Sequence, residues 1–199
     1  MKIGIIGAGG IGQAFAKQAS KAGYEVIISN SRGADSLKEI VSAIGGNLKA
    51  GTFEDALQSD VTFLAVQWKH LESVLKMDVS WKDKIVIDPI NPIITPGFQM
   101  AELSGRTSSE IVADLLTGAR IVKAFNTYTP QLLESNPAEA GGKRVIFYSG
   151  NDDSAKKVVA EIISKIGFAG VDLGSLAVGG KLQQFPGGTL PGLNLIQLP

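Results

Sequence analysis

The sequence has 199 residues, with 19 basic and 19 acidic side chains, a single histidine and no cysteine. The balanced charge argues against a polyanionic partner such as nucleic acid. The lack of cysteine excludes disulfides, thiolate metal ligands and cysteine nucleophiles, and one histidine is too few for a multi-histidine metal site, so we expect no metal centre. No apolar run approaches the roughly 20 residues that span a bilayer. The first residues lead directly into a strand-like run rather than a signal peptide. We therefore expect a soluble, cytoplasmic protein without a membrane partner.

Short apolar runs alternate with segments of helical period along the chain. The runs predict strands that are buried on both faces of a sheet, at residues 3–7, 25–29, 61–66, 84–88, 119–125, 145–149 and 169–173. Apolar side chains at helical spacing predict helices between them, near residues 11–22, 37–44, 71–75, 111–116 and 155–166. A capping box, Thr107 to Glu110, opens the fourth helix. This alternation predicts a single-domain, Rossmann-type α/β fold, doubly wound, with a mainly parallel sheet and helices on both faces.

The pattern ends near Leu176. Residues 176–199 are rich in glycine and proline and have no helical period. We therefore divide the chain into a main domain, residues 1–175, and a C-terminal arm, residues 176–199. The arm either lies on the surface of the domain, or lines the active site or contacts a second subunit. Its apolar side chains, such as Leu182 and Phe185, argue against a free, solvated tail.

A glycine-rich loop follows the first predicted strand and opens the first predicted helix. In a G-x-G-x-x-G loop, Gly7 allows the tight turn, Gly9 lets a pyrophosphate approach the backbone, and Gly12 lets helix and strand pack closely. The N–H groups of the first helical turn and the helix dipole would stabilise the phosphates. The alternative is a glycine-rich turn without a ligand. We predict that a dinucleotide is bound by Gly7, Ala8, Gly9, Gly10, Ile11 and Gly12.

The end of the second predicted strand carries the signal for cofactor choice. An acidic residue there would hold the ribose hydroxyls of NAD and repel a 2′-phosphate. This chain instead has the neutral Asn30, followed by Ser31 and Arg32, whose hydroxyl and guanidinium can together hold a phosphate. We therefore predict NADP(H) rather than NAD(H). The alternatives are a solvated Arg32 at a helix start, or a ribose contact from Asp35, which we take to be an early-helix residue.

Three further strand ends are predicted to border a nicotinamide ring, because ligands of doubly wound sheets bind at the carboxyl ends of the strands. After the third of the long strands, Trp68 either stacks on a ring or covers the sheet edge. His70 is either a general acid or base or a packed histidine at a helix start. Further along, Asn91 either holds an amide or carbonyl or serves the turn before a proline. For Asn126 and Thr127, at the end of an apolar strand, we favour a functional role.

The chain has no candidate triad, no paired carboxylates at a strand end and, as we interpret it, no lysine in an apolar setting. Hydride transfer between two rings needs no nucleophile. It needs the rings face to face, with the reacting carbons roughly 3–3.5 Å apart and water kept out. We therefore expect hydride transfer, with no assigned catalytic residue and with Trp68, His70, Asn126 and Thr127 as candidates.

An ordered set of stretches resembles the NADPH-dependent coenzyme F-420 reductase family, or F-420:NADP oxidoreductases, and the related reductase domain of the STEAP metalloreductases. The resemblance covers most of residues 1–175 and rests on the glycine loop and on "SNSRG", "AVQWKH", "KIVIDPINP", "SSEIVADLL", "IVKAFNT" and "GNDDSAKKVVAEIISKIG". It implies NADPH, with Ser31 and Arg32 on the 2′-phosphate, a deazaflavin or flavin ring stacked near the nicotinamide, and a homodimer. The further cofactor contacts are expected at Ala65, Val66, Gln67, His70, Asn91 and Asn126.

Three functions follow from these features. The leading one is an NADPH-dependent oxidoreductase that passes hydride to or from a deazaflavin, such as F-420, or a flavin-like acceptor. The second is a reductase of a small imine or keto substrate, although such enzymes usually need a large helical second domain for which 199 residues leave no room. The third is a non-catalytic NADP(H)-binding module that senses redox state. A cleft for a tricyclic ring favours the enzyme, whereas a nicotinamide site capped by the arm favours the sensor.

Overall fold

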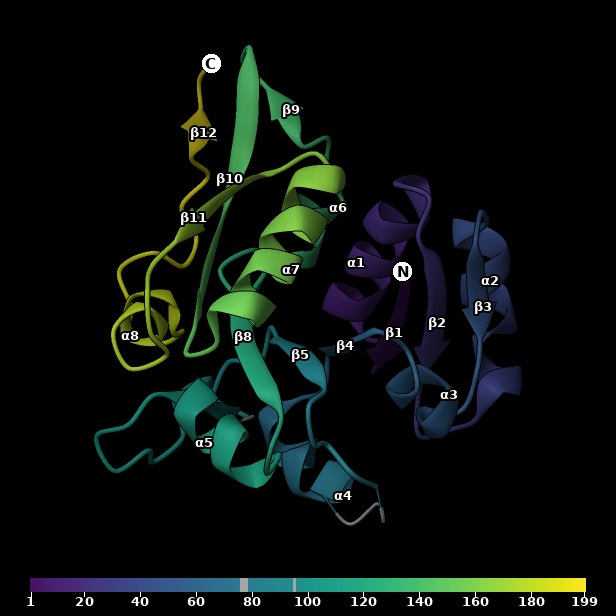
Figure 1. The fold of residues 1–199 in the computed structure, drawn as a ribbon, viewed down its shortest axis with the longest axis horizontal. Helices are drawn as coiled ribbons and strands as arrows, with labels where there is room; N and C mark the ends of the chain where they lie inside the picture. Colours follow the sequence, from purple (N-terminus) through teal and green to yellow (C-terminus); the bar gives the residue numbers. More distant parts are fainter. Residues whose placement is uncertain (76–78, 95) are drawn as a thin grey trace.

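One mixed β-sheet forms the centre of the protein (Figure 1). The computed structural model describes residues 1–75, 79–94 and 96–199. Hydrogen-bonded strands follow the order β11-β10-β8-β5-β4-β1-β2-β3. Their bounds are β1 (Lys2–Ile6), β2 (Glu25–Ser29), β3 (Leu48–Ala50), β4 (Val61–Leu64), β5 (Ile85–Asp88), β8 (Arg120–Ala124), β10 (Gly142–Gly150) and β11 (Ala169–Asp172). Short strands complete the set: β9 (Ala138–Glu139) and β12 (Ile196–Gln197) pair with β10, and β6 (Ile93–Ile94) forms a hairpin with β7 (Gln99–Met100).

Helices cover both faces of this sheet. One face packs against α1 (Gly10–Lys21), α2 (Lys38–Ile44) and α7 (Asp153–Lys165). The other packs against α3 (Phe53–Leu57), α4 (Leu71–Leu75) and α5 (Ser108–Leu115). Shorter elements are α6 (Pro130–Glu134), α8 (Gly179–Gln183) and the 3₁₀ turns η1 (Ala34–Leu37) and η2 (Trp68–His70). The predicted Rossmann-type, doubly wound fold is therefore confirmed.

The strands form where the sequence predicts them. Each of the seven predicted strands is present, and the ends differ from the predicted ends by at most three residues. The residues of β4 and β5 are buried without interruption, as expected for strands covered on both faces. The prediction missed β3, which has three residues and an exposed Lys49 in its middle. So short a strand carries too few apolar positions to be recognised.

The five predicted helices are also present. The segment near 37–44 begins earlier, as the 3₁₀ turn η1, and continues as α2. The capping box of α5 is confirmed, because Glu110 N–H donates to the Thr107 hydroxyl while Thr107 N–H donates to the Glu110 carboxylate. In α4, Leu71 and Val74 are buried as predicted, and the Leu75 side chain lies outside the described part of the structure.

Strand directions explain where ligands can bind. The strands from β3 through β1 to β8 are parallel, whereas β10 runs antiparallel to β8. From β1 the chain crosses to β2 on one side, and then returns to β4 on the other side. The order therefore reverses at β1, and the loop that follows β1 lies at the topological switch point, where doubly wound sheets bind ligands.

The C-terminal arm packs onto the domain instead of extending into solvent. Although residues 176–199 have no helical period, they contain α8, which packs against β10, and β12, which pairs with the edge of β10 (Figure 1). Arg144 on β10 donates to Asn194, and Val145 N–H donates to Leu195 O over 2.9 Å. These bonds give order to a glycine- and proline-rich segment that has no helical period of its own. None of the helices in the described ranges is long and apolar enough to cross a bilayer.

Candidate active site

The sequence-predicted site residues gather at one edge of the sheet. The loops after β1, β2, β4, β5 and β8 all leave the carboxyl ends of parallel strands. The loop after β1 lies against the loop after β4, because a Cβ on Gly7 would stand 2.2 Å from the Ala65 carbonyl oxygen. It also lies against α6, because a Cβ on Gly10 would stand 2.8 Å from Pro130. Segments 58 and 120 residues further along the chain therefore meet the glycine loop.

Two of the loop's glycines are required by the protein itself. Gly7 has a φ of +108°, a conformation that side chains other than glycine rarely adopt. A Cβ on Gly12 would stand 2.1 Å from the Gly7 carbonyl oxygen, so α1 and β1 can approach only without it. Gly9, in contrast, has an ordinary φ of −75°, and its Cβ would meet nothing within 4 Å. The described protein does not explain Gly9, but a pyrophosphate lying on its exposed backbone would.

The first turn of α1 suits an anion. Gly9 caps the helix without a side-chain hydrogen bond, and no acidic residue lies in the first turn. The free N–H groups and the helix dipole are therefore open to a phosphate. The Ala8 carbonyl accepts from the Gln13 side chain over 2.8 Å, which fixes the entry to the helix.

The loop after β2 presents a free cation. Asn30 accepts the Arg32 N–H over 2.9 Å and donates to the Ser36 hydroxyl over 2.9 Å, so its amide shapes the turn. Ser31 and Arg32 are exposed. Within residues 1–75, 79–94 and 96–199, the Arg32 guanidinium forms no ion pair or side-chain hydrogen bond. Asp35 lies in η1, as predicted for an early-helix residue, and its carboxylate pairs with Lys38 at 2.7 Å on the surface.

Of the predicted site residues in the loop after β4, some lie near the glycine loop and others lie on the surface. Ala65 and Val66 are half-buried, and Ala65 lies beside the glycine loop, whereas Gln67 is exposed. Trp68 begins η2 and packs against the buried apolar cluster that includes Leu71 and Val74. His70 is exposed, and its backbone carbonyl accepts from the Ser73 hydroxyl. No described contact joins His70 to the glycine loop.

Asn91 and Asn126 are brought together. Asn91 donates its amide to the Asn126 backbone carbonyl, and Asn126 donates to Asn91 Oδ1, both over 2.9 Å. The arm joins this pair, because the Gln183 carbonyl accepts from Asn126 over 2.6 Å and the Phe185 N–H donates to Asn91 Oδ1 over 3.2 Å. The two amides predicted to contact a nicotinamide or an acceptor therefore bond to each other and to the arm.

The segment after β8 holds an unusual backbone and an unpaired hydroxyl. Phe125 is fully buried and has a φ of +67°, which costs about 1–3 kcal/mol for a residue other than glycine and is typical of functional sites. Thr127 is 4% exposed, and its hydroxyl has no hydrogen-bond partner among the described residues. An orphaned buried polar atom is expected to meet a ligand or water. Both residues are direct neighbours of Asn126 in the chain.

The expectation of no lysine in an apolar setting is wrong. Lys123, on β8 between buried apolar neighbours, is 0% exposed, and so is Asp88 at the end of β5. The Lys123 ammonium lies 3.6 Å from Asp88 Oδ2 and donates to the Ile90 carbonyl over 2.9 Å. Burial lowers the pKa of Lys123, and the Asp88 carboxylate opposes that shift. The signal was present in "IVKAFNT", where a lysine interrupts a strand that is otherwise apolar on both faces.

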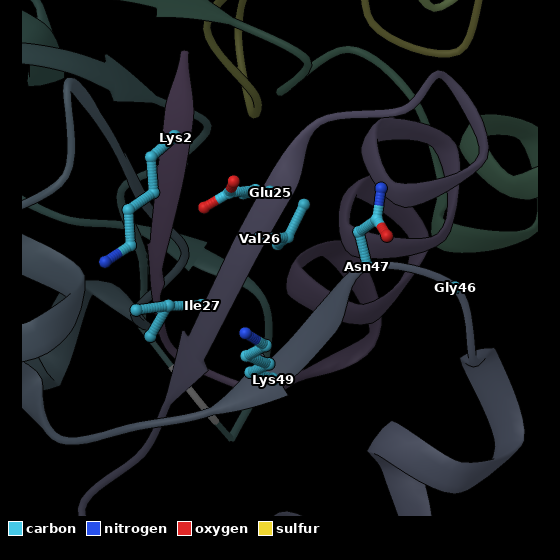
Figure 2. A pocket seen from close by; sticks show the side chains of 7 residues that line it. All are labelled: Lys2, Glu25, Val26, Ile27, Gly46, Asn47 and Lys49. Carbon is cyan, nitrogen blue, oxygen red and sulfur yellow. The ribbon is translucent and has the colours of Figure 1, made fainter.

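The opposite edge of the sheet has a different character. A hollow of about 250 Å³ lies at the amino ends of β1, β2 and β3. Figure 2 shows the seven residues that line it, Lys2, Glu25, Val26, Ile27, Gly46, Asn47 and Lys49. None of the predicted site residues lines it. Because ligands of this fold bind at the carboxyl ends of strands, the hollow is not part of the candidate site.

The strand order, the switch point after β1 and the glycine loop define a Rossmann-type fold of the dinucleotide-binding class. The pattern of the family described as "NADP oxidoreductase coenzyme F420-dependent" matches residues 2–92. A crystal structure of a hypothetical protein from Sinorhizobium meliloti is 44% identical, covers 99% of this chain and 96% of its own, and superposes with a TM-score of 0.93. The match of residues 2–92 to this family confirms the predicted resemblance.

Two more distant proteins are similar to this chain over most of its length. A putative F420-dependent NADP reductase from Arthrobacter sp. FB24 shares the fold, with a TM-score of 0.75, 24% identity and coverage of 88% of this chain and 86% of that one. The rat metalloreductase STEAP3 is 28% identical over 192 residues, which are 96% of this chain and 37% of the relative. The chain spans 35–37% of the length of the curated relatives it matches. The family and these named relatives are oxidoreductases.

Proposed function

We propose that the protein is an NADP(H)-dependent oxidoreductase that transfers hydride between the nicotinamide and a deazaflavin, such as F-420, or a flavin-like acceptor. NADP(H) supplies the hydride, or receives it, at its nicotinamide ring. The match of residues 2–92 to the family supports the reaction class. The arrangement of the loops at the carboxyl edge of the sheet supports the place of binding.

The residues of the chain have separable tasks in this proposal. The backbone of the glycine loop and the free N–H groups of α1 hold the pyrophosphate. Ser31 and Arg32 hold the 2′-phosphate, with Arg32 able to give two parallel charge-assisted bonds. Ala65 and Val66 line the route toward the sheet edge. Asn91, Asn126 and Thr127 border the nicotinamide end, where the buried hydroxyl of Thr127 is a donor or acceptor for the cofactor or its partner ring.

Gly9 is the observation that carries the proposal. Packing and backbone conformation account for Gly7 and Gly12, but nothing in the described protein requires a glycine at position 9. A ligand that must touch the backbone there does require one. Arg32, exposed and unpaired in the same part of the site, supplies the charge that a 2′-phosphate needs.

Single-turnover reduction tests the acceptor. We would mix the full chain with NADPH and follow the absorbance at 340 nm after adding F-420, FMN, a ferric chelate or a cyclic imine in separate experiments. Rapid oxidation of NADPH with F-420 or FMN is expected. Oxidation with the imine alone would favour the small-substrate reductase, and tight NADPH binding without oxidation in any arm would refute the proposed enzyme.

A second candidate function is favoured by one feature of the arm. The Gln183 carbonyl and the Phe185 N–H bond directly to Asn126 and Asn91, so the arm caps the end of the site where an acceptor ring would lie. A capped nicotinamide site suits a module that binds NADP(H) and reports redox state. Limited proteolysis of the arm with NADP⁺ and with NADPH separates the candidates, because a sensor is expected to give different cleavage rates with the two forms.

A further inference from the structure

A buried pair of opposite charges joins the ends of β5 and β8. Asp88 and Lys123 are both fully buried, and 3.6 Å separates Asp88 Oδ2 from Lys123 Nζ. Such a pair contributes little net stability, since apolar residues of similar size often replace one without loss. The proposed function assigns no task to either residue. The presence of this charged pair between two loops of the candidate site therefore needs another explanation.

The charged pair hydrogen-bonds to both backbone polar groups of one residue, Ile90. The Ile90 N–H donates to Asp88 Oδ1 over 2.8 Å, and the Ile90 carbonyl accepts from Lys123 Nζ over 2.9 Å. Both backbone polar groups of Ile90 are thus bound by the two charges. The pair also bonds to the first turn of α5. The Ser109 hydroxyl donates to Asp88, and Lys123 donates to the Ser108 hydroxyl over 3.3 Å.

The two asparagines of the site lie close in sequence to the residues of these hydrogen bonds. Asn91 directly follows Ile90, and Asn126 lies three residues beyond Lys123. The asparagines bond reciprocally, each donating its side-chain amide to the other residue. The arm is tied to the same place, because Gln183, itself 0% exposed, donates from Nε2 to the Phe147 carbonyl over 3.0 Å and accepts from the Ser149 hydroxyl over 2.7 Å. A shift of Ile90 would therefore move Asn91 relative to Asn126 and the arm.

We infer that Asp88 and Lys123 are positioning residues, which fix the Asn91–Asn126 pair on the acceptor side of the site by holding the backbone of Ile90. This inference deepens the proposed function and rests on it for its effect on catalysis. Its structural part, the fixing of two side-chain amides by a buried charge pair, stands without any assumption about the acceptor. The nucleotide-binding loops share no described hydrogen bond with the pair, so cofactor affinity is expected to be independent of it.

Two variants of the full chain test the inference. Lys123→Met removes the donor to Ile90 while keeping the length of the side chain. Asp88→Asn combined with Lys123→Met also removes the charge left behind, keeps an oxygen for the Ile90 N–H, and serves if the single variant does not fold. The matched control is Lys156→Met, because Lys156 also pairs with two carboxylates, Asp153 and Asp172, but on α7 away from the site.

The decisive readout is hydrogen exchange of the Asn91 and Asn126 side-chain amides, measured by ¹⁵N NMR. In the folded Lys123→Met or double variant we expect exchange at least tenfold faster than in the wild type, with the dissociation constant for NADP⁺ changed less than twofold. Lys156→Met is expected to leave both quantities unchanged. With FMN as acceptor, kcat should fall at least tenfold in the variants that lack Lys123.

The outcomes separate the inference from the proposed function. If both folded variants keep the wild-type exchange rates, the positioning role is wrong, whatever the activity. A lower melting temperature with unchanged exchange would assign the pair a structural role only and would also overturn the inference. If the wild type reduces neither FMN nor F-420 but the amides exchange faster in the variants, the positioning role stands and the proposed reaction fails.

Discussion

Two regions of one site use opposite chemistry. The nucleotide region, which we define as residues 7–12, 30–32 and 65–67, offers exposed backbone and a free guanidinium. The acceptor region, which we define as residues 88–92, 123–127 and 183–185, consists largely of buried side chains that bond to one another. The first region has polar groups that wait for a ligand. In the acceptor region, most polar groups are hydrogen-bonded to other groups of the same region.

This difference indicates that the nucleotide region is suited to recognising a charged group, whereas the acceptor region is suited to keeping a fixed geometry. Phosphates are recognised by donors that are free before binding, so an open region binds them without breaking internal bonds. A hydride transfer needs two rings held at fixed distance and orientation, and a network of satisfied buried bonds supplies that rigidity. Thr127 is the exception in the acceptor region, because its buried hydroxyl has no partner among the described residues.

The largest effect on stability is expected from a glycine substitution that disrupts the packing of the nucleotide region. In Gly12→Ala the new methyl would stand 2.1 Å from the Gly7 carbonyl oxygen, so α1 must move from β1 and the free energy of unfolding should fall by about 3 kcal/mol. Gly9→Ala is the matched control. It meets no atom within 4 Å, so its stability should change by less than about 1 kcal/mol while NADPH affinity falls. Urea unfolding and fluorescence titration with NADPH measure the two quantities. An equally unstable Gly9→Ala would remove the distinction between the two glycines.

A smaller effect is expected at the free cation. Arg32→Ala should weaken NADPH binding by about 1.5–3 kcal/mol, the range for a hydrogen bond to a charged group, and leave NADH nearly unaffected. Arg106→Ala is a suitable control, because Arg106 is exposed but its guanidinium is already paired with Asp114 at 2.7 Å. Calorimetric titration with both cofactors checks the prediction. Equal losses for NADPH and NADH would assign Arg32 a role other than binding the 2′-phosphate.

The smallest effect on stability is expected at the exception in the acceptor region. Thr127→Val replaces an unpaired buried hydroxyl by a methyl group of the same shape, so the free energy of unfolding should stay the same or rise by about 1 kcal/mol. If the hydroxyl serves a ligand, NADP⁺ or acceptor binding should weaken in the same variant. Thermal unfolding with and without saturating NADP⁺ measures both effects. A variant that loses stability without ligand would mean that the hydroxyl already has a partner.

Much of the fold could be predicted because its signals are local. Apolar runs marked the seven main strands, helical stripes marked five helices, and Thr107 with Glu110 marked a helix start, each within a few residues of sequence. The short elements β3, α3, α6 and α8 were missed. Each of these four elements has five residues or fewer, and its neighbours in the folded chain hold it in place.

The site was predicted less evenly. The sequence indicated which strand ends carry polar residues, and the fold brings those ends to one edge. It gave no sign that Asn91 and Asn126 bond to each other, since 35 residues separate them. Lys123 was detectable as a charge within an apolar strand but was overlooked, and its partner Asp88 lies on a neighbouring strand.

The amino-acid sequence by itself determined the class of fold, the glycine loop and the neutral-to-basic end of the second strand, because each depends on the order of neighbouring residues. The tertiary structure decided which amides pair, which charges are buried together, and that the C-terminal arm bonds to Asn91 and Asn126. Those contacts join distant parts of the chain, and their strength depends on burial, which no local pattern specifies.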